Sequence, residues 1–363
     1  MSNAIKNSNL TKAKFAKNDE FYTQYADIEK EMNAYLAYDP DVFKNKIILL
    51  PCDDPEWSNF TLYFSQNFNR LGLKKLISTS YAYAARQPNE AYQPSLFEES
   101  ILQSEADKPP KCGKFFELER EAGKDGVVTI KDLKWRYLKG DGDFRSEEIK
   151  ALRDQADIVI TNPPFSLFRE FIAWIMEGGK RFAVVGNKNC VTYKEVFPLI
   201  KANKLWSGRT EWAGGMWFET KYDDVDKVVN GINMKNVPSI WVTNMEHGRR
   251  HEPLQLMTME DNKQFNSRIV GKHAYQEYDN YKAIEVPFTQ AIPSDFTGVM
   301  GVPISFLDKY NPEQFEILGI DTDVKEGRLS SLVKDGWTGK IDRGYLNGKR
   351  MYSRLLIRFK KEN

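Results

Sequence analysis

One short stretch of the sequence places an amide, two prolines and an aromatic ring directly after a run of apolar and β-branched residues. Asn162, Pro163, Pro164 and Phe165 follow segment 158–161, which predicts a short buried strand. Proline has no N–H and restricts the residue before it, so two oxygen acceptors, the Asn162 side chain and the Pro163 carbonyl, are held on a rigid turn. Two acceptors beside an aromatic face suit a planar group that carries an exocyclic amine. The expected chemistry is transfer of a group to that amine nitrogen.

Acidic residues follow an earlier expected strand, at 46–50. Pro51, Asp53 and Asp54 come directly after it, and a helix to about residue 68 is expected next. Open α/β sheets bind ligands at the carboxyl ends of their parallel strands, which is where these acids would lie. The alternative is a loop that only caps the following helix.

Two further segments could complete a ligand site. The expected strand 73–80 ends in hydroxyl residues that include Ser78. A Gly-Asp-Gly-Asp-Phe run carries Asp141, Asp143 and Phe144, and its glycines permit close approach of the backbone. The next expected helix, 146–156, leads into the strand before Asn162. The hydroxyl residues and the Asn162 turn therefore each follow a predicted strand.

Taken in order, these motifs resemble the EcoRI-type adenine-specific DNA methyltransferases. Asn162-Pro163-Pro164-Phe165 resembles the Asn-Pro-Pro-aromatic motif of S-adenosylmethionine-dependent amino-methyltransferases. Phe21-Tyr22-Thr23 resembles an element that closes over the methionine part of the cofactor. Segment 51–55 resembles the family's Pro-Cys-Asp-Asp-Pro element, and the resemblance extends from about residue 14 to the C-terminal basic hairpin.

The resemblance implies S-adenosylmethionine as cofactor and a set of residues that contact it. That set is Phe21, Tyr22, Thr23, Pro51, Asp53, Asp54, Ser78, Asp141, Asp143, Phe144 and Asn162. Carboxylates suit a cationic sulfonium cofactor. The chain departs from the usual methyltransferase pattern in two places. The loop after the first strand has no glycine, and the second strand ends in hydroxyls where an acid usually binds the ribose.

The implied activity is site-specific methylation of adenine N6 in duplex DNA, in restriction-modification or DNA protection. An adenine would be flipped out of the helix, stacked on Phe165 and oriented by Asn162 and Pro163, on the turn that Pro164 completes. The partner is double-stranded DNA. A separate cognate restriction endonuclease is compatible with this role, and methylating one strand at a time requires only a monomer. No metal is implied.

Composition is consistent with these expectations. The chain has 363 residues, 41% apolar and 28% charged, with a net charge of +1. Such a composition predicts a globular protein with a substantial core. There is no apolar run of about 18 residues and no apolar signal-peptide core at the start, so no membrane partner is expected. Three widely separated cysteines form no zinc or disulfide pattern, which favours a cytoplasmic location.

The expected fold class is α/β. A Rossmann-like S-adenosylmethionine-dependent methyltransferase sheet in residues 1–245 would carry catalysis, closed by antiparallel strands that include 216–218 and 239–243. A β-rich target-recognition region in residues 246–363 would contact DNA. Residues 325–363 carry eleven Lys or Arg and four acids, hence +7. Such a charge suits phosphate contact through Arg350, Arg354 and Arg358, although a solvated basic tail would have the same composition.

Three rival interpretations remain open from the sequence. A methyltransferase of this motif could act on an RNA base or a protein amide nitrogen. Glu219-Thr220-Lys221 has the Glu-x-Lys spacing of a magnesium-dependent nuclease, a tripeptide that is common by chance. A non-catalytic DNA-binding protein on the same scaffold is the third. Methyl transfer without magnesium, together with cofactor binding, separates them.

Overall fold

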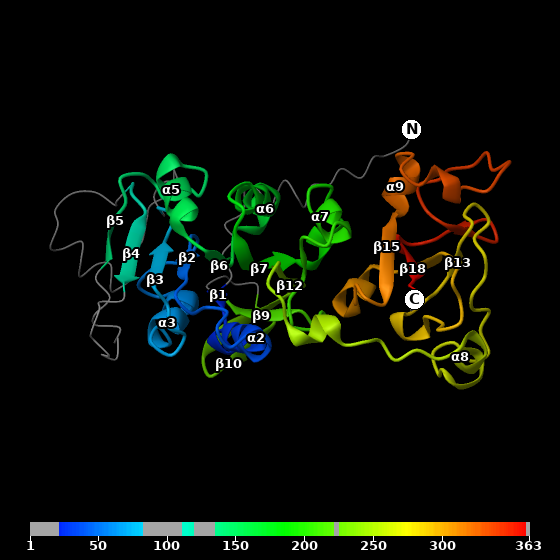
Figure 1. Ribbon diagram of the computed structural model, residues 1–363, viewed down its shortest axis with the longest axis horizontal. Helices are drawn as coiled ribbons and strands as arrows, with labels where there is room; N and C mark the ends of the chain where they lie inside the picture. Colours follow the sequence, from blue (N-terminus) through cyan, green and yellow to red (C-terminus); the bar gives the residue numbers. More distant parts are fainter. Residues whose placement is uncertain (1–21, 83–110, 120–134, 221–224, 361–363) are drawn as a thin grey trace. The chain divides into compact units, whose positions relative to one another are not determined.

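The computed structural model describes residues 22–82, 111–119, 135–220 and 225–360, and the chain divides into two compact units (Figure 1). The first unit comprises residues 1–196 and 212–245, and the second comprises residues 197–211 and 246–363. The short segment 197–211 thus belongs to the second unit although it lies within the sequence of the first. No described helix is both long and apolar enough to cross a membrane.

A mixed sheet forms the centre of the first unit. Its strands are β2 (Ile47–Leu50), β3 (Lys75–Thr79), β4 (Lys114–Glu119), β5 (Trp135–Tyr137), β6 (Ile158–Thr161), β7 (Arg181–Asn187) and β12 (Ser239–Thr243). Within this unit they follow the order β5-β4-β3-β2-β6-β7-β12. Strands β3, β2, β6 and β7 run parallel, and Leu49 of β2 lies between Ile77 and Val159. Their carboxyl ends therefore meet at one edge of the sheet.

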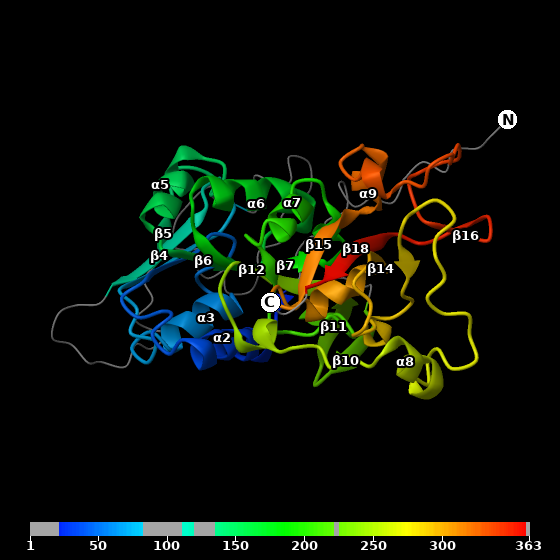
Figure 2. The ribbon, with the colours of Figure 1, turned by 45° about the vertical axis from the view of Figure 1, so that its right-hand side comes forward.

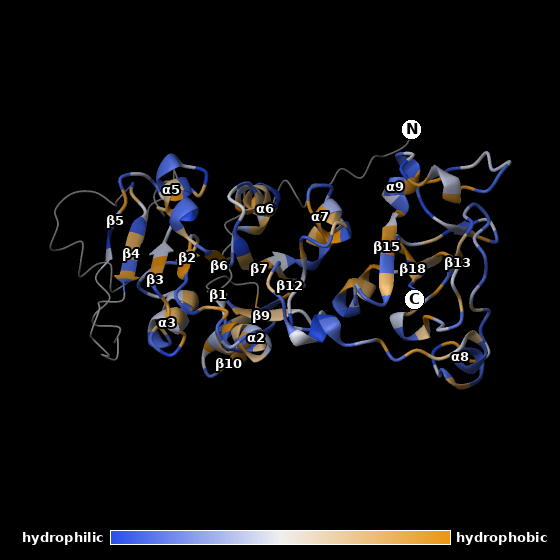
Figure 3. Cartoon of the chain, in the orientation of Figure 1, coloured by the Kyte–Doolittle hydropathy of each residue, from blue (hydrophilic) through white to orange (hydrophobic). Residues whose placement is uncertain are grey.

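Helices cover both faces of this sheet. Figures 1 and 2 show α5 (Glu147–Gln155) and α6 (Phe168–Glu177) on one side, and α2 (Tyr25–Tyr38) and α3 (Asn59–Gln66) on the other. Figure 3 shows α5 as mainly hydrophilic and α6 as richer in apolar residues. Alternate strand residues such as Ile48 and Ile160 are fully buried against α2 and α3. Serine side chains cap two of these helices: Ser58 accepts from the Phe60 N–H and Ser146 from the Ile149 N–H.

A second, antiparallel sheet also belongs to the first unit. It has the order β1-β9-β11-β10, with β1 (Tyr22–Thr23), β9 (Met216–Glu219), β11 (Ile232–Val237) and β10 (Lys227–Val229). The prediction that residues 216–218 help to close the main sheet is wrong. Met216 and Phe218 are buried in the core that α2 and α3 share, and β9 pairs with β1 and β11. Strand β12 does pair antiparallel with β7, as predicted.

The second unit has a small sheet of its own, in the order β13-β14-β18-β15. Its strands are β13 (Ile284–Glu285), β14 (Met300–Pro303), β15 (Phe315–Ile320) and β18 (Arg354–Phe359); the unit also contains α7 (Phe197–Lys201), β8 (Trp206–Ser207), α8 (Met259–Phe265), α9 (Asp321–Lys325) and the paired strands β16 (Tyr345–Leu346) and β17 (Lys349–Arg350). Asn347 and Gly348 both have positive φ, which confirms the predicted hairpin turn. Segment 301–307 is a strand only to Pro303, and a 3-10 helix follows.

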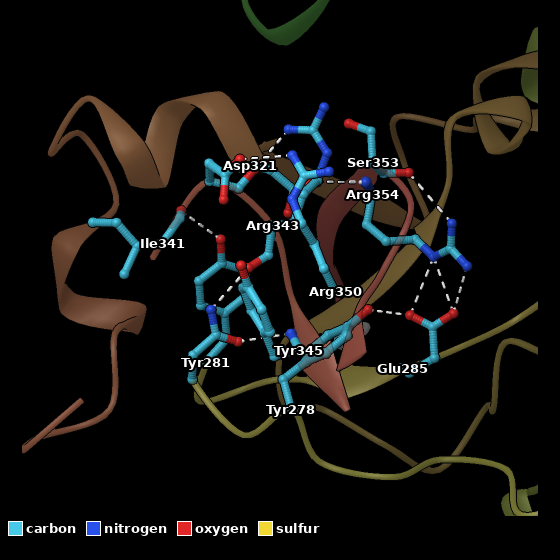
Figure 4. A network of polar contacts seen from close by, with 12 residues as sticks. Tyr278, Tyr281, Glu285, Asp321, Ile341, Arg343, Tyr345, Arg350, Ser353 and Arg354 are labelled. Atoms are coloured by element: carbon cyan, nitrogen blue, oxygen red, sulfur yellow. Dashed lines mark hydrogen bonds and ion pairs between the residues drawn. The ribbon is translucent and has the colours of Figure 1, made fainter. Parts of the chain in front are cut away.

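A buried ion pair organises the second unit (Figure 4). The Arg354 guanidinium donates to both carboxylate oxygens of Glu285, with a closest N–O distance of 2.6 Å, and Tyr278 donates its hydroxyl to the same carboxylate. The Arg354 and Glu285 side chains are 12% and 8% exposed. The prediction that Arg354 contacts DNA phosphate is therefore wrong, because its charge is already paired inside the fold. Arg350 and Arg358 are about half exposed and pair with surface acids.

Candidate active site

The turn after β6 is built as its residue types predict. Thr161 is fully buried at the end of the strand, Asn162 is half-buried and Pro163 is buried. Phe165 is half-buried and packs against the core beneath the main sheet. The serine after Phe165 predicts a helix cap from its residue type, and this prediction is wrong: Ser166 does not cap a helix, because a 3-10 turn at Phe165–Leu167 precedes α6.

Asp53 connects the acidic loop after β2 to this turn. One carboxylate oxygen accepts from the Ser58 hydroxyl at 2.8 Å, and the other accepts from the Thr161 hydroxyl at 2.6 Å. The Asp53 residue is only 5% exposed. Thr161 directly precedes Asn162, so this hydrogen bond holds the loop after one strand against the turn after its neighbour. A pairing between residues so far apart in the chain left no signal in the sequence.

The same loop is also joined to β3. The Asp53 N–H donates to the Thr79 carbonyl at 2.9 Å, and the Ser78 hydroxyl donates to the Asp53 carbonyl at 2.6 Å. Ser78 is fully buried, and its hydroxyl also lies 2.8 Å from that of Thr61. The Thr79 hydroxyl donates to the Pro51 carbonyl. Residues Pro51, Asp53 and Ser78, which were singled out for different reasons, thus form one hydrogen-bonded group.

Burial raises the pKa of Asp53 to about 7, and the hydrogen bonds from Thr161 and Ser58 partly oppose this shift. Removing a carboxylate from water disfavours its charged form, whereas donated hydrogen bonds favour it. The group therefore titrates near neutral pH. A cationic ligand placed close to Asp53 would favour the charged form, so binding of such a ligand and ionisation of Asp53 would promote each other.

Asp54 lies beside Asp53 and has different partners. Its carboxylate accepts from the Glu56 N–H and forms an ion pair with Lys114 at 3.2 Å. Burial raises the pKa of Asp54, and the charge of Lys114 opposes the rise. Lys114 also pairs with Glu56 and its ammonium group lies 5.1 Å from the centre of the Trp135 ring. Sequence reasoning missed Lys114, because a lysine at the start of a strand carries no signal that it will meet an acid 60 residues earlier.

The Gly-Asp-Gly-Asp-Phe run lies between β5 and α5, against the segment that follows β3. Gly142 has φ +81°, and a β-carbon at this position would lie 2.2 Å from the Ser80 carbonyl oxygen. The Ala82 N–H donates to the Asp141 carbonyl at 2.7 Å. Only glycine accommodates both this backbone conformation and this close approach. The Gly-Asp-Gly-Asp-Phe loop is thereby placed beside the loops that follow β3 and β2.

Asp143 and Phe144 have well-defined partners in this loop. Arg145 forms a 2.6 Å ion pair with Asp143 and holds the pKa of that carboxyl below its ordinary value. The Phe144 ring is 5% exposed and packs edge-on against Phe171 and Trp174 of α6. The Phe144 side chain therefore attaches this loop to the helix that follows the Asn162 turn.

The expected N-terminal element forms strand β1, although Phe21 lies outside the described residues. The Thr23 carbonyl accepts from the Asn59 side chain at 2.9 Å, at the start of α3 and close to the acidic loop. The Thr23 hydroxyl is buried and has no hydrogen-bond partner among the described residues. Buried polar atoms are nearly always paired, so an unpaired hydroxyl here is what a site for a polar ligand would leave.

Among the residues that the structure describes, no group of three or more His, Cys, Asp or Glu side chains could hold a metal ion. Glu219 lies in β9, opposite Met234 and Tyr22, and Lys221 of the proposed nuclease tripeptide lies outside the described ranges.

The arrangement combines an acidic loop with an Asn-Pro-Pro-Phe turn at neighbouring ends of parallel strands. Such a site is typical of S-adenosylmethionine-dependent enzymes that methylate an amino group. Comparison with known proteins agrees: the family model described as adenine-specific methyltransferase EcoRI matches residues 9–360. The chain belongs to this family. It is accordingly an adenine-specific DNA methyltransferase whose methyl donor is S-adenosylmethionine.

Three curated relatives match over nearly their whole length. Type II methyltransferase M.EcoRI of Escherichia coli is 40% identical over 369 residues, which covers 99% of each chain. Type II methyltransferase M.MpnI of Mycoplasma pneumoniae is 34% identical over 363 residues, 96% of this chain and 97% of the relative. M.MgeORF184P of Mycoplasma genitalium is 34% identical over 361 residues, 96% and 98% respectively. No solved structure gave a significant match.

Proposed function

We propose that Asn162, Pro163 and Phe165 form the pocket for an adenine flipped out of duplex DNA. The Asn162 side-chain oxygen and the Pro163 carbonyl accept the two N6–H bonds, and the Phe165 ring stacks on the base. Pro164 completes the rigid turn. Orienting the amine in this way directs its lone pair toward the methyl donor, and positioning of two reactants accounts for much of the rate in such transfers. Extruding the base costs a few kcal/mol, which stacking and these hydrogen bonds offset.

The hydrogen bond between Asp53 and Thr161 carries this proposal, because it joins the loop after β2 to the turn that bears Asn162. The residues that would hold the cofactor are Asp53 and Asp54, with Thr23 and Asp143 from adjacent segments. Bound S-adenosylmethionine supplies an activated methyl group on a positively charged sulfur. Carboxylates near that charge favour binding, and the unpaired Thr23 hydroxyl offers a polar contact.

Several of the expected residues would act through their neighbours. Ser78 and Phe144 are buried in contacts with Asp53 and with α6, so we assign them to the support of the loops. We also propose that the parallel part of the main sheet is the Rossmann-like methyltransferase scaffold of residues 1–245. Residues 246–363 would then provide target recognition, through exposed basic side chains such as Lys349 and Arg350.

The curated relatives are named Type II methyltransferases. We infer that this chain likewise takes part in restriction-modification, acts as a monomer and has a separate endonuclease as its cognate partner. Sedimentation of the protein alone and bound to one duplex tests whether the chain acts as a monomer. A stable dimer in both states would contradict the monomer.

The test of the active-site assignment is Asn162→Ala. Methyl transfer from labelled S-adenosylmethionine to unmethylated duplex DNA is measured without magnesium, and the product nucleosides are separated. Wild-type enzyme should place label in N6-methyladenine, and mapping the labelled adenines identifies the recognition site. Asn162→Ala should abolish transfer while cofactor affinity stays within about threefold, because only one contact to the base is removed.

Two results would count against the assignment. Normal turnover by Asn162→Ala would move the amine-binding turn elsewhere. Wild-type label found in RNA or in a protein, with none in DNA, would favour the alternative amine substrates. Asn33→Ala serves as a matched control, because Asn33 is an exposed asparagine of α2 in the same unit.

A further inference from the structure

A hairpin of the first unit exposes β-branched side chains at its tip. It consists of β10 and β11, which follow one another across a two-residue turn at Asn230-Gly231. Val228, Val229 and Ile232 are 61%, 43% and 43% exposed. Edge strands normally carry charged or short polar residues, because an apolar edge promotes aggregation. An exposed apolar tip is therefore a feature that calls for a binding role.

The hairpin is rigid enough to present this tip in one position. Asn230 and Gly231 have φ values of +50° and +81°, which gives the tight turn whose twist matches the two strands. At the open end, the Asp226 carboxylate pairs with Lys235 at 3.1 Å and accepts from the Asn236 N–H at 2.9 Å. Little conformational entropy would therefore be lost when the tip binds.

The two faces of the hairpin are not equivalent. Val229 lies directly opposite Ile232 across the strands, so their side chains form a pair on one face. Val228 lies opposite Asn233 and points to the other face. On the face of the pair, the Lys227 ammonium lies 3.6 Å from the centre of the Trp217 ring. The Val229–Ile232 pair is thus an apolar tip with a cation at its base.

We propose that the Val229–Ile232 pair enters the base stack of the DNA beside the target adenine and holds open the gap that the flipped base leaves. Apolar side chains inserted between base steps are a known way to unstack a duplex, and the Lys227 ammonium at the base of the hairpin suits a flanking phosphate. The hairpin also belongs to the sheet whose other edge is β1, which the Asn59 side chain joins to the start of α3. The wedge and the cofactor loops are parts of one unit.

A second copy of this chain fits the hairpin less well. Strand β10 has three residues, and a stable protein interface needs about 800 Å² from each partner, far more than so short an edge supplies. Duplex DNA is already the substrate. Its apolar base stack matches the Val229–Ile232 pair, and its anionic exterior matches the cation at the base of the hairpin.

This inference rests on the proposed flipping of adenine, and its test separates the two. The double variant Val229→Ser/Ile232→Ser is compared with wild type on two duplexes that contain the mapped recognition site. In one duplex the target adenine is paired, and in the other it faces an abasic site, so that extrusion costs less. Val228→Ser is the matched control, since it makes the same change on the opposite face of the same strand.

The double variant should lose about tenfold or more in kcat/KM on the paired duplex and less than about threefold on the duplex with the unpaired adenine, because a wedge matters only where stacking must be broken. Fluorescence of 2-aminopurine at the target position should rise less with the variant than with wild type. Val228→Ser should match wild type on both duplexes.

An equal loss on both duplexes, or no loss on either, would overturn the wedge while leaving the proposed function intact. A wild-type dimer that the double variant converts to a monomer would also overturn it, in favour of an interface between copies. If 2-aminopurine fluorescence did not rise with the wild-type enzyme, adenine flipping itself, and with it the proposed function of the Asn162 turn, would fail.

Discussion

The hydrogen bond between Thr161 and Asp53 gives the sharpest test of how this site is assembled. Thr161→Val removes the hydroxyl and keeps the shape of the side chain. The hydroxyl is fully buried and donates to the Asp53 carboxylate at 2.6 Å. A buried hydrogen bond to a charged group contributes about 1.5–3 kcal/mol. We expect the free energy of unfolding to fall by about 2 kcal/mol at pH 8, where Asp53 is charged.

The pH dependence of this loss follows from the pKa of Asp53. Burial raises that pKa to about 7, so below pH 6 the group is mainly protonated and the lost donor matters less. Thr161→Val should raise the pKa further, because a donor that favours the charge is gone. Turnover should also fall by about tenfold or more, since the loop after β2 is no longer held against the Asn162 turn.

Urea unfolding at pH 6 and pH 8 and single-turnover methyl transfer measure these effects. Ser58→Ala is the control: it removes the other donor to Asp53, at 2.8 Å, which holds the loop only to its own helix. That variant also loses the cap that Ser58 provides to α3, so it should lose at least as much stability and keep most of its turnover. A double-mutant cycle with Asp53→Asn isolates the coupling of Thr161 to Asp53. Unchanged turnover in Thr161→Val, or a coupling energy near zero, would refute the reasoning.

Three more outcomes are expected. Gly142→Ala should lower the free energy of unfolding by about 1–3 kcal/mol, because the added methyl group would lie 2.2 Å from a backbone oxygen at a φ of +81°; thermal unfolding measures this, and an unchanged midpoint would contradict the close approach. Arg354→Ala should cost about 3–5 kcal/mol by leaving Glu285 buried and uncompensated, whereas Arg350→Ala should cost less than about 1 kcal/mol at its half-exposed position. Since the folded-state pKa of Asp53 is raised, its contribution to the free energy of unfolding is fully present below pH 4 and is lost as pH rises through about 7. Affinity for the cationic cofactor should rise over the same pH range. Asp53→Asn should flatten the pH profiles of stability and of cofactor affinity in calorimetry, and a pH dependence that persists would have to come from another group.

Much of the local structure was predictable because the signals lie in neighbouring residues. Short apolar runs predicted β2 and β6, and the helix expected over 146–156 is confirmed by α5. Asn347-Gly348 predicted a hairpin because both residues accept positive φ. Ser166 failed as a cap because the two prolines before it lead the chain into a 3-10 turn first.

Errors arose where a residue's partner lies far away in the sequence. Strand 216–218 carries the pattern of a strand, but nothing in it specifies which sheet it joins, and burial against α2 and α3 decided this. Arg354 is a basic residue in a strand of alternating apolar and polar residues, which suggested a DNA contact. Glu285, 69 residues earlier, neutralises its charge inside the second unit. Lys114 gave no signal at all before its pairing with Asp54 was known.

The sequence by itself determined the family, the order of the motifs and the rigid Asn162 turn, because these depend on residue types and on the stiffness of adjacent prolines. Tertiary structure alone decided how the motifs are joined. The Thr161 hydroxyl reaches Asp53 because β2 and β6 are neighbours in a parallel sheet, and that adjacency comes from packing between segments more than 100 residues apart. The sequence pattern specifies residue types and local conformation, whereas contacts between side chains that are far apart in the sequence are specified only by the folded chain.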